Sequence, residues 1–122
     1  TAMRMEVLRT AAGALVLNDS YNANPTSMRA ALDALAALPV DRRFAVLGVM
    51  AEISDPAAEH RGILEYARRL GVEVVATGTD LYGIDPVDDP VAALGSIAGG
   101  DAVLVKGSRV AGLERVAAAL LA

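Results

Sequence analysis

The sequence contains no cysteine and no tryptophan, and it has only one phenylalanine and three tyrosines. Without cysteine the chain forms no disulfide, no thiolate metal site and no cysteine nucleophile. The scarcity of aromatic side chains argues against a surface on which nucleic-acid bases stack. We therefore expect an aliphatic core, built mainly from alanine, leucine and valine.

The chain also lacks clusters of like charge and long apolar runs. The formal net charge is −4, and acidic and basic residues are interspersed, so no basic stripe is present that would bind a phosphate backbone. No apolar run approaches the ~20 residues that span a bilayer, and the first residues lack a secretion signal. We expect neither nucleic acid nor a membrane as a partner. The chain begins with Thr1 instead of an initiator methionine, which suggests a piece of a longer protein.

Short apolar segments alternate with amphipathic ones along the chain. Strands are predicted at residues 3–10, 14–19, 43–49, 72–77 and 102–106, with a shorter one around 84–87. Helices are predicted at residues 25–38, 57–70, 90–98 and 109–121, the last with Val110, Leu113, Ala117 and Leu120 on one face. This alternation predicts one domain over residues 1–122, a three-layer Rossmann-like α/β sandwich whose mostly parallel sheet has an antiparallel edge strand at residues 3–10.

Residues 18–25 form the most polar loop between a strand and a helix. Asn24 and Pro25 are typical of a helix start, as the N-cap and the first-turn proline. Asp19 ends the preceding strand, where its carboxylate would accept hydrogen bonds from two ribose hydroxyls or help to hold a cation. The alternative is an aspartate that bonds the amides of its own turn.

Parallel strands place all their strand-to-helix loops at one edge of the sheet, where residues 19–24, 50–55, 77–80 and 106–109 are expected to meet. The segment Lys106-Gly107-Ser108-Arg109 combines loop amides, a hydroxyl and two cations, which suits a phosphate or carboxylate. It is not a P-loop, because that glycine-rich pattern occurs nowhere in the chain. The alternative makes Ser108 a helix cap, with Lys106 and Arg109 in solvent.

Three further side chains are candidates near this edge. His60 lies on the apolar side of its helix, where it is a buried packing residue or a residue that orients a loop or touches a ligand. Glu52 lies in the adjoining loop and would orient a cationic partner or remain a solvated acid. Arg4 lies on the wet side of the first strand.

These motifs together resemble the C-terminal domain of the Mur ligases. The resemblance rests on residues 19–28, on Val46-Leu47-Gly48-Val49-Met50-Ala51-Glu52, on His60, on Val105-Lys106-Gly107-Ser108-Arg109 and on the opening strand, and it covers nearly the whole chain in order. Within the family, the Tyr-Asn-Ala-Asn-Pro and Lys-Gly-Ser-Arg versions are similar to those of members that add D-Ala-D-Ala. Two positions depart from the family pattern, Val49 for an aspartate and Ser54 for a glycine.

The resemblance implies a cytoplasmic ATP-dependent ligase with Mg²⁺. ATP phosphorylates the terminal carboxylate of UDP-N-acetylmuramoyl-tripeptide, and the amine of D-Ala-D-Ala attacks the acyl phosphate, in peptidoglycan precursor synthesis. The P-loop and the magnesium ligands belong to a central domain, and the UDP site to an N-terminal domain, both outside this chain. The isolated chain is therefore expected to be inactive, with no catalytic residue and no metal ligand of its own.

The resemblance also implies roles for individual residues. Asp19 and Arg4 would contact the nucleotide. Lys106, Ser108 and Arg109 would bind the incoming dipeptide or the phosphates. Asn22 and Asn24 would shape the wall between the domains, in the substrate-binding part of the site.

Three other interpretations remain open. One is the equivalent domain of a folylpolyglutamate, cyanophycin or single-amino-acid ligase. Another is a response-regulator receiver, although Val49 or Thr77 stands where its phosphoacceptor aspartate belongs and Gly107 stands where its proline belongs. The third is a stand-alone binding module.

Overall fold

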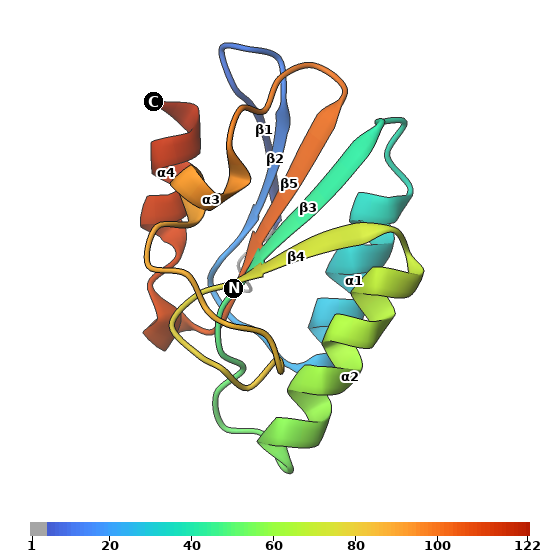
Figure 1. Ribbon diagram of the computed structural model, residues 1–122, viewed down its shortest axis with the longest axis vertical. Coiled ribbons are helices and arrows are strands. Elements are labelled where there is room, and N and C mark those ends of the chain that lie inside the picture. The colour runs from blue at the N-terminus through green and yellow to red at the C-terminus, as the bar shows by residue number, and fades with distance from the viewer. Residues whose placement is uncertain (1–4) are drawn as a thin grey trace.

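The computed structural model describes residues 5–122, which form a five-stranded sheet with helices on both faces (Figure 1). The strands lie in the order β1-β2-β5-β3-β4. They are β1 Glu6–Arg9, β2 Leu15–Asp19, β3 Arg42–Leu47, β4 Val72–Ala76 and β5 Asp101–Lys106. The helices are α1 Pro25–Ala36, α2 Pro56–Arg69, α3 Pro90–Leu94 and α4 Glu114–Leu121, with a 3₁₀ turn η1 at Arg109–Ala111.

The sheet is parallel except at one edge, as the sequence predicts. Strands β2, β5, β3 and β4 pair in parallel, whereas β1 pairs antiparallel with β2 and places Glu6 opposite Asn18. Strand β5 lies in the middle, and all of its residues are buried. A strand covered on both faces must be apolar along most of its length, which explains the run of alanine, valine and leucine at residues 102–105.

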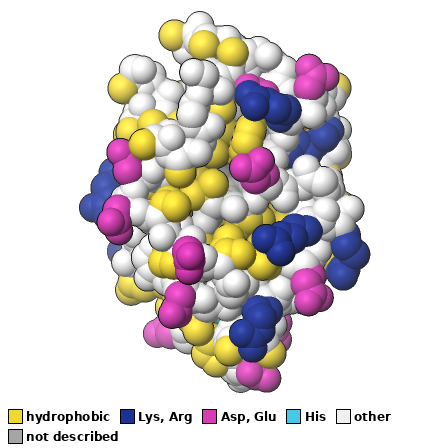
Figure 2. All heavy atoms as spheres, in the orientation of Figure 1, with side chains coloured by type: hydrophobic (Ala, Val, Ile, Leu, Met, Phe, Trp, Pro, Cys, Tyr) yellow, Lys and Arg dark blue, Asp and Glu magenta, His cyan; other side chains and the backbone are white. Residues whose placement is uncertain are grey.

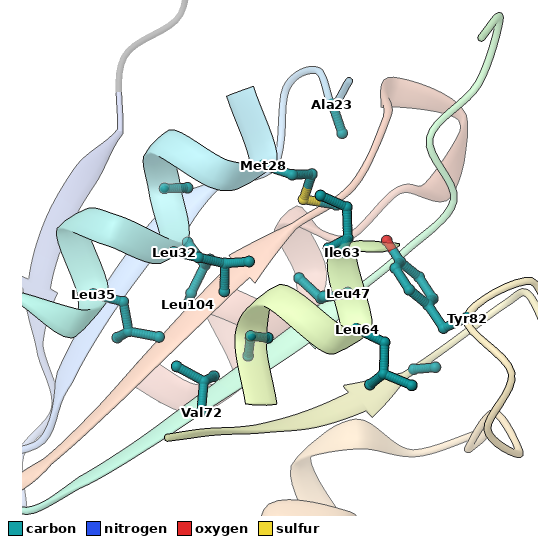
Figure 3. Close-up of a cluster of buried hydrophobic side chains, with 14 of the residues drawn as sticks. Ala23, Met28, Leu32, Leu35, Leu47, Ile63, Leu64, Val72, Tyr82 and Leu104 are labelled. Atoms are coloured by element: carbon teal, nitrogen blue, oxygen red, sulfur yellow. The ribbon is translucent and has the colours of Figure 1, made fainter. Parts of the chain in front are cut away.

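Two buried clusters hold the three layers together. Alternate residues of a strand point to opposite faces, so Leu104 belongs to the cluster under α1 and α2, while Val105 belongs to the cluster under α3 and α4. Figure 3 shows Leu32 of α1 beside Leu104, and Ile63 of α2 beside Met28, in the first cluster. Each helix pair covers one face of the sheet. The loops that join strands to helices therefore lie at the edge of the sheet and not over its faces.

Three predicted elements differ from the structure. The strand expected at residues 84–87 is absent, because this segment has only the end of β4 beside it and shares one backbone hydrogen bond with it, from Val87 N–H to Ala76 O. Helix α3 ends at Leu94, not at residue 98, because Gly95 adopts a positive φ of 69°. The single helix predicted for residues 109–121 is split at Gly112, whose φ is 63°. The 3₁₀ turn leaves Val110 78% exposed, away from the predicted apolar face.

Arg42 and Asp101 form an ion pair where β3 and β5 begin. Arg42 donates from Nε to Oδ1 and from Nη2 to Oδ2 of Asp101, both at 2.8 Å, and the Ala98 amide also donates to Oδ2 at 2.9 Å. The Arg42 hydrogen bonds, followed by the Ala98 amide, lower the pKa of Asp101 below its ordinary value. A carboxylate with a lowered pKa stabilises the fold above its unfolded pKa of about 3.9 and loses that effect as the pH falls through the folded pKa.

We therefore expect Arg42→Met to lower the free energy of unfolding at about pH 7 and to lower it much less at about pH 3. Urea unfolding at the two pH values measures the difference. Arg68→Met, which removes an exposed arginine from the last turn of α2, is the matched control and should show no such pH dependence. An equal loss at both pH values in Arg42→Met would contradict the role of this pair.

The surface agrees with the charge pattern of the sequence. On the face drawn in Figure 2, acidic and basic side chains lie among each other without a patch of one sign. None of the helices formed by residues 5–122 has both the length and the hydrophobicity to cross a bilayer.

Candidate functional site

The loops that follow β2, β5 and β3 meet at the carboxyl edge of the sheet. The chain leaves β2 and β3 towards α1 and α2 on one face, but it leaves β5, which lies between them, towards α4 on the other face (Figure 1). Neighbouring loops that diverge to opposite faces open a crevice at the strand ends, the usual place for ligands in such sheets. The structure thus confirms that residues 19–24 and 106–109 lie side by side.

Asp19 and Lys106 form the centre of this edge. The two residues are directly opposite each other in the register of β2 and β5. The Lys106 ammonium donates to Oδ2 of Asp19 at 2.9 Å and to the carbonyl oxygen of Asn22 at 2.8 Å. The Lys106 side chain is 2% exposed and that of Asp19 19%. The alternative that placed Lys106 in solvent is therefore wrong. The second oxygen of the Asp19 carboxylate, Oδ1, accepts no hydrogen bond from residues 5–122.

The loop from residue 19 to residue 24 is held by short-range hydrogen bonds. The Asn22 side chain accepts from the Ala23 amide at 3.0 Å. Asn24 caps α1 as predicted, because its side chain accepts from the Ser27 amide at 2.8 Å while the Ser27 hydroxyl accepts from the Asn24 amide at 3.0 Å. A cavity of about 410 Å³ opens beside the loop, and Asp19, Asn22 and Asn24 line it together with Lys106.

The segment after β5 is packed tightly against the end of β3. A Cβ atom at Gly107 would lie 3.1 Å from the Cα of Gly48, so a larger residue would push the two chains apart by a few tenths of an ångström. The Ser108 amide donates to the Val49 carbonyl at 2.9 Å. Within residues 5–122, the hydroxyl of Ser108 is the one buried side-chain polar atom with no hydrogen-bond partner. Buried polar atoms are nearly always bonded, so this hydroxyl is available to a ligand or a water molecule.

Arg109 lies at the rim of the crevice. Its guanidinium stacks 5.2 Å from the ring centre of Tyr21, so the loops after β5 and β2 also meet above the ion pair. Both side chains are exposed. Arg109 does not cap a helix carbonyl or pair with a carboxylate within residues 5–122 and therefore keeps its charge available at the crevice.

His60 is a loop-orienting residue rather than a surface ligand. It is fully buried, its Nε2 accepts from the Met50 amide at 2.9 Å, and its Nδ1 lies 2.6 Å from the Pro56 carbonyl oxygen. Since Nε2 accepts, Nδ1 carries the proton and donates it to that carbonyl. The ring therefore ties the start of α2 to the loop after β3, in agreement with the structural role considered from the sequence.

Tyr82 completes this arrangement, and the sequence analysis missed it. Its ring meets His60 edge-on with the centroids 4.8 Å apart, and its hydroxyl donates to the Gly48 carbonyl at 2.7 Å. Burial raises the pKa of the Tyr82 hydroxyl, which remains a donor. Figure 3 shows Tyr82 next to Ile63 and Leu64 of α2. The available signal was an aromatic residue in a loop of a chain with very few aromatics.

The roles predicted for Glu52 and Arg4 are not tested by contacts in the structure. Glu52 is exposed, with a positive φ of 58°, and has no ion pair within residues 5–122, so its orienting role stays a prediction. Arg4 lies outside the described residues, and its nucleotide contact also stays a prediction. On the other side of the crevice, a second cavity of about 200 Å³ is lined in part by Thr77, Asp88 and Arg115, none of which the sequence singled out as a site residue.

A comparison with known families narrows the open interpretations to the Mur ligases. The model of the glutamate ligase domain of the Mur ligases matches residues 3–89. The chain belongs to this Mur ligase family. The receiver is thereby excluded.

Individual relatives agree with this assignment. The chain is 40% identical to the UDP-N-acetylmuramoyl-tripeptide–D-alanyl-D-alanine ligase of Mycobacterium tuberculosis H37Rv, over 98% of this chain and 31% of the relative. It is 34% identical to the enzyme of the same name from Escherichia coli K12, over 96% of this chain and 29% of the relative. The solved structure of MurF ligase from Thermotoga maritima in complex with ADP superposes with a TM-score of 0.81 at 27% identity, covering 94% of this chain and 29% of that one. The chain thus spans about a third of the length of the relatives it matches.

Proposed function

We propose that the chain is the C-terminal domain of a cytoplasmic ATP-dependent ligase that joins D-Ala-D-Ala to UDP-N-acetylmuramoyl-tripeptide. The proposal rests on the relatives of that name, which match nearly the whole of this chain. The crevice at the ends of β2 and β5 offers a place where their substrates could bind. The solved Thermotoga relative was crystallised with ADP, which supports the use of a nucleotide. About two thirds of the length of each relative is not matched by this chain, which leaves room for a central ATPase domain and an N-terminal UDP-binding domain.

In this proposal Asp19 accepts hydrogen bonds from the ribose of the nucleotide. Its Oδ1 faces no donor within residues 5–122, and the carboxylate lines the larger cavity. Ser108 and Arg109 supply a hydroxyl donor and a cation for the dipeptide carboxylate or the transferred phosphate, with Asn22 and Asn24 in the adjoining wall. The support is the unpartnered hydroxyl of Ser108 and the accessible guanidinium of Arg109.

The neighbouring domains supply the other half of the site. Residues 5–122 contain no cluster of three or more His, Asp and Glu side chains placed to hold a metal ion, so the proposal assigns no Mg²⁺ ligand to this chain. When bound, Mg²⁺ neutralises phosphate charge during transfer from ATP. An acyl phosphate is easily hydrolysed, and a domain that closes over it excludes water and completes the site only with substrates present.

The first test is a ligation assay with the full-length protein, produced from the reading frame that contains this chain. We expect ATP-dependent formation of UDP-N-acetylmuramoyl-pentapeptide from D-Ala-D-Ala, with stoichiometric ADP and phosphate, and no product from residues 1–122 alone. Single amino acids, including L-glutamate, serve as competing acceptors. A preference for one of them over D-Ala-D-Ala would contradict the proposed substrate and favour another Mur-type ligase.

A further inference from the structure

Lys106 is the only lysine of the chain, and its other long basic side chains are all arginines. It is also the most deeply buried cation described, since the residue is 1% exposed at the end of the central strand. A charge at such a position is costly unless it is paired and hydrogen-bonded. A cation at this buried position therefore needs an opposite charge and hydrogen-bond acceptors around it.

The geometry shows why a lysine fits there. The ammonium is a compact point charge that donates in several directions, whereas a guanidinium is a broad planar fork. Two of its donors are directed at Oδ2 of Asp19 and at the carbonyl oxygen of Asn22, at 2.9 and 2.8 Å. The first bond orients the carboxylate, and the second fixes the loop three residues later. One side chain on β5 thereby sets the shape of the loop that follows β2.

We propose that Lys106 is a positioning residue that presets Asp19 for the ribose, and that it acts through Asp19 instead of touching the dipeptide or a transferred phosphate. The inference rests on the proposed function, because it assumes that Asp19 receives the nucleotide. With Oδ2 held by the ammonium, the carboxylate is fixed in rotation and Oδ1 is presented to the cavity. The nucleotide half-site is then formed in this domain before the neighbouring domains close on it.

The first experiment compares ATP with 2′-deoxy-ATP in the full-length ligase. An oriented carboxylate that bonds both ribose hydroxyls is expected to favour ATP about tenfold in kcat/KM. In Lys106→Met, which keeps the length and loses the donors, we expect KM for ATP to rise about tenfold and the preference for ATP to fall within about twofold of unity. KM for D-Ala-D-Ala should stay within about twofold of the wild-type value.

The comparison with Asp19→Asn separates action through Asp19 from direct contact. If Lys106 acts through Asp19, the double variant Asp19→Asn/Lys106→Met loses no more kcat/KM for ATP than the more damaged single variant. Multiplied losses, or a tenfold rise in KM for the dipeptide in Lys106→Met, would overturn the proposal. Lys106→Gln, which retains two N–H donors, should recover part of the preference for ATP. Arg68→Met is the control for loss of a cation elsewhere.

A second measurement needs no variant and tests, even if Lys106→Met does not fold, whether the ammonium of Lys106 is kept away from the dipeptide. Acetic anhydride acylates accessible amines, and peptide mass spectrometry reports each lysine of the full-length enzyme. We expect Lys106 to be acylated at least about tenfold more slowly than surface lysines, with or without ATP and dipeptide, because its ammonium is buried and paired. Rapid labelling that D-Ala-D-Ala suppresses would instead show a substrate-binding amine.

The two proposals fail in different ways. A wild-type enzyme without ATP-dependent ligation would refute the proposed function. A wild-type enzyme that ligates D-Ala-D-Ala, but whose Lys106→Met variant keeps its preference for ATP over 2′-deoxy-ATP, would refute only the positioning role.

Discussion

Replacing Asp19 by alanine is expected to lower kcat/KM for ATP by about 10²–10⁴-fold in the full-length ligase. A hydrogen bond to a charged group contributes about 1.5–3 kcal/mol, and each 1.4 kcal/mol corresponds to a factor of ten. Two such bonds to ribose hydroxyls account for the expected loss. Steady-state kinetics at varied ATP concentration, with D-Ala-D-Ala at saturation, measure it.

The same substitution has a second effect, on stability. It leaves the ammonium of Lys106, whose side chain is 2% exposed, without its carboxylate partner. Breaking a buried pair in this way costs about 3–5 kcal/mol, so urea unfolding of Asp19→Ala should show a loss of this order. We therefore expect stability and nucleotide recognition to change together when Asp19 is replaced by alanine.

Asp19→Asn separates the two effects. The amide oxygen remains able to accept from Lys106, so we expect a smaller loss of stability than in Asp19→Ala. The loss in kcat/KM for ATP should nevertheless remain at least about tenfold, because the negative charge is gone. Kinetic constants for ATP close to those of the wild type in both variants would show that Asp19 does not receive the nucleotide.

The local elements of the fold were predictable because each depends on neighbouring residues. Val16 and Leu17 belong to a short apolar strand, and Asn24 and Pro25 begin a helix in the way such residues usually do. The alternation of strands and helices then predicted the layers and the edge that carries the loops. Two of the three errors fell where a glycine conformation decided the outcome, at Gly95 and Gly112. The third, the strand expected at residues 84–87, depended on pairing with β4, which no local pattern states.

The contacts within the site were less predictable. Asp19 and Lys106 were both recognised as candidates, but they are 87 residues apart, and their pairing depends on β5 inserting between β2 and β3. No local pattern states the order of parallel strands. From the sequence, Lys106 was interpreted as a substrate ligand or a solvated cation. The contact that points to a third role, with the partly buried carboxylate of Asp19, could not be read from the sequence.

The same reasoning applies to His60. Its place on the buried side of α2 followed from the helical period, whereas its bond to the Met50 amide depends on the path of an irregular loop. Within that loop Glu52 and Asp55 both have positive φ, with values of 58° and 50°. Non-glycine residues adopt this conformation only where the surroundings impose it. His60 and Tyr82 hold this loop at Gly48, Met50 and Pro56.

His60→Ala is accordingly expected to lower the free energy of unfolding by about 3–5 kcal/mol. The substitution removes a fully buried ring and leaves the buried Met50 amide without an acceptor, which costs about 1–3 kcal/mol in addition to the cavity. The midpoint of thermal unfolding should fall by roughly 10–20 °C for a domain of this size. Urea and thermal unfolding followed by circular dichroism measure both quantities.

Two variants of α2 make this result specific to the loop. His60→Gln retains one acceptor and donors on a shorter planar group, so we expect it to recover part of the loss. Glu65→Ala changes an exposed residue of the same helix and should alter the free energy of unfolding by less than about 0.5 kcal/mol. Because the loop packs against Ser108 through Val49, loosening it should also reduce ligation by the full-length enzyme at temperatures where His60→Ala is still folded. If His60→Ala loses stability but ligates at the wild-type rate, His60 has only a packing role and the order of the loop does not affect ligation.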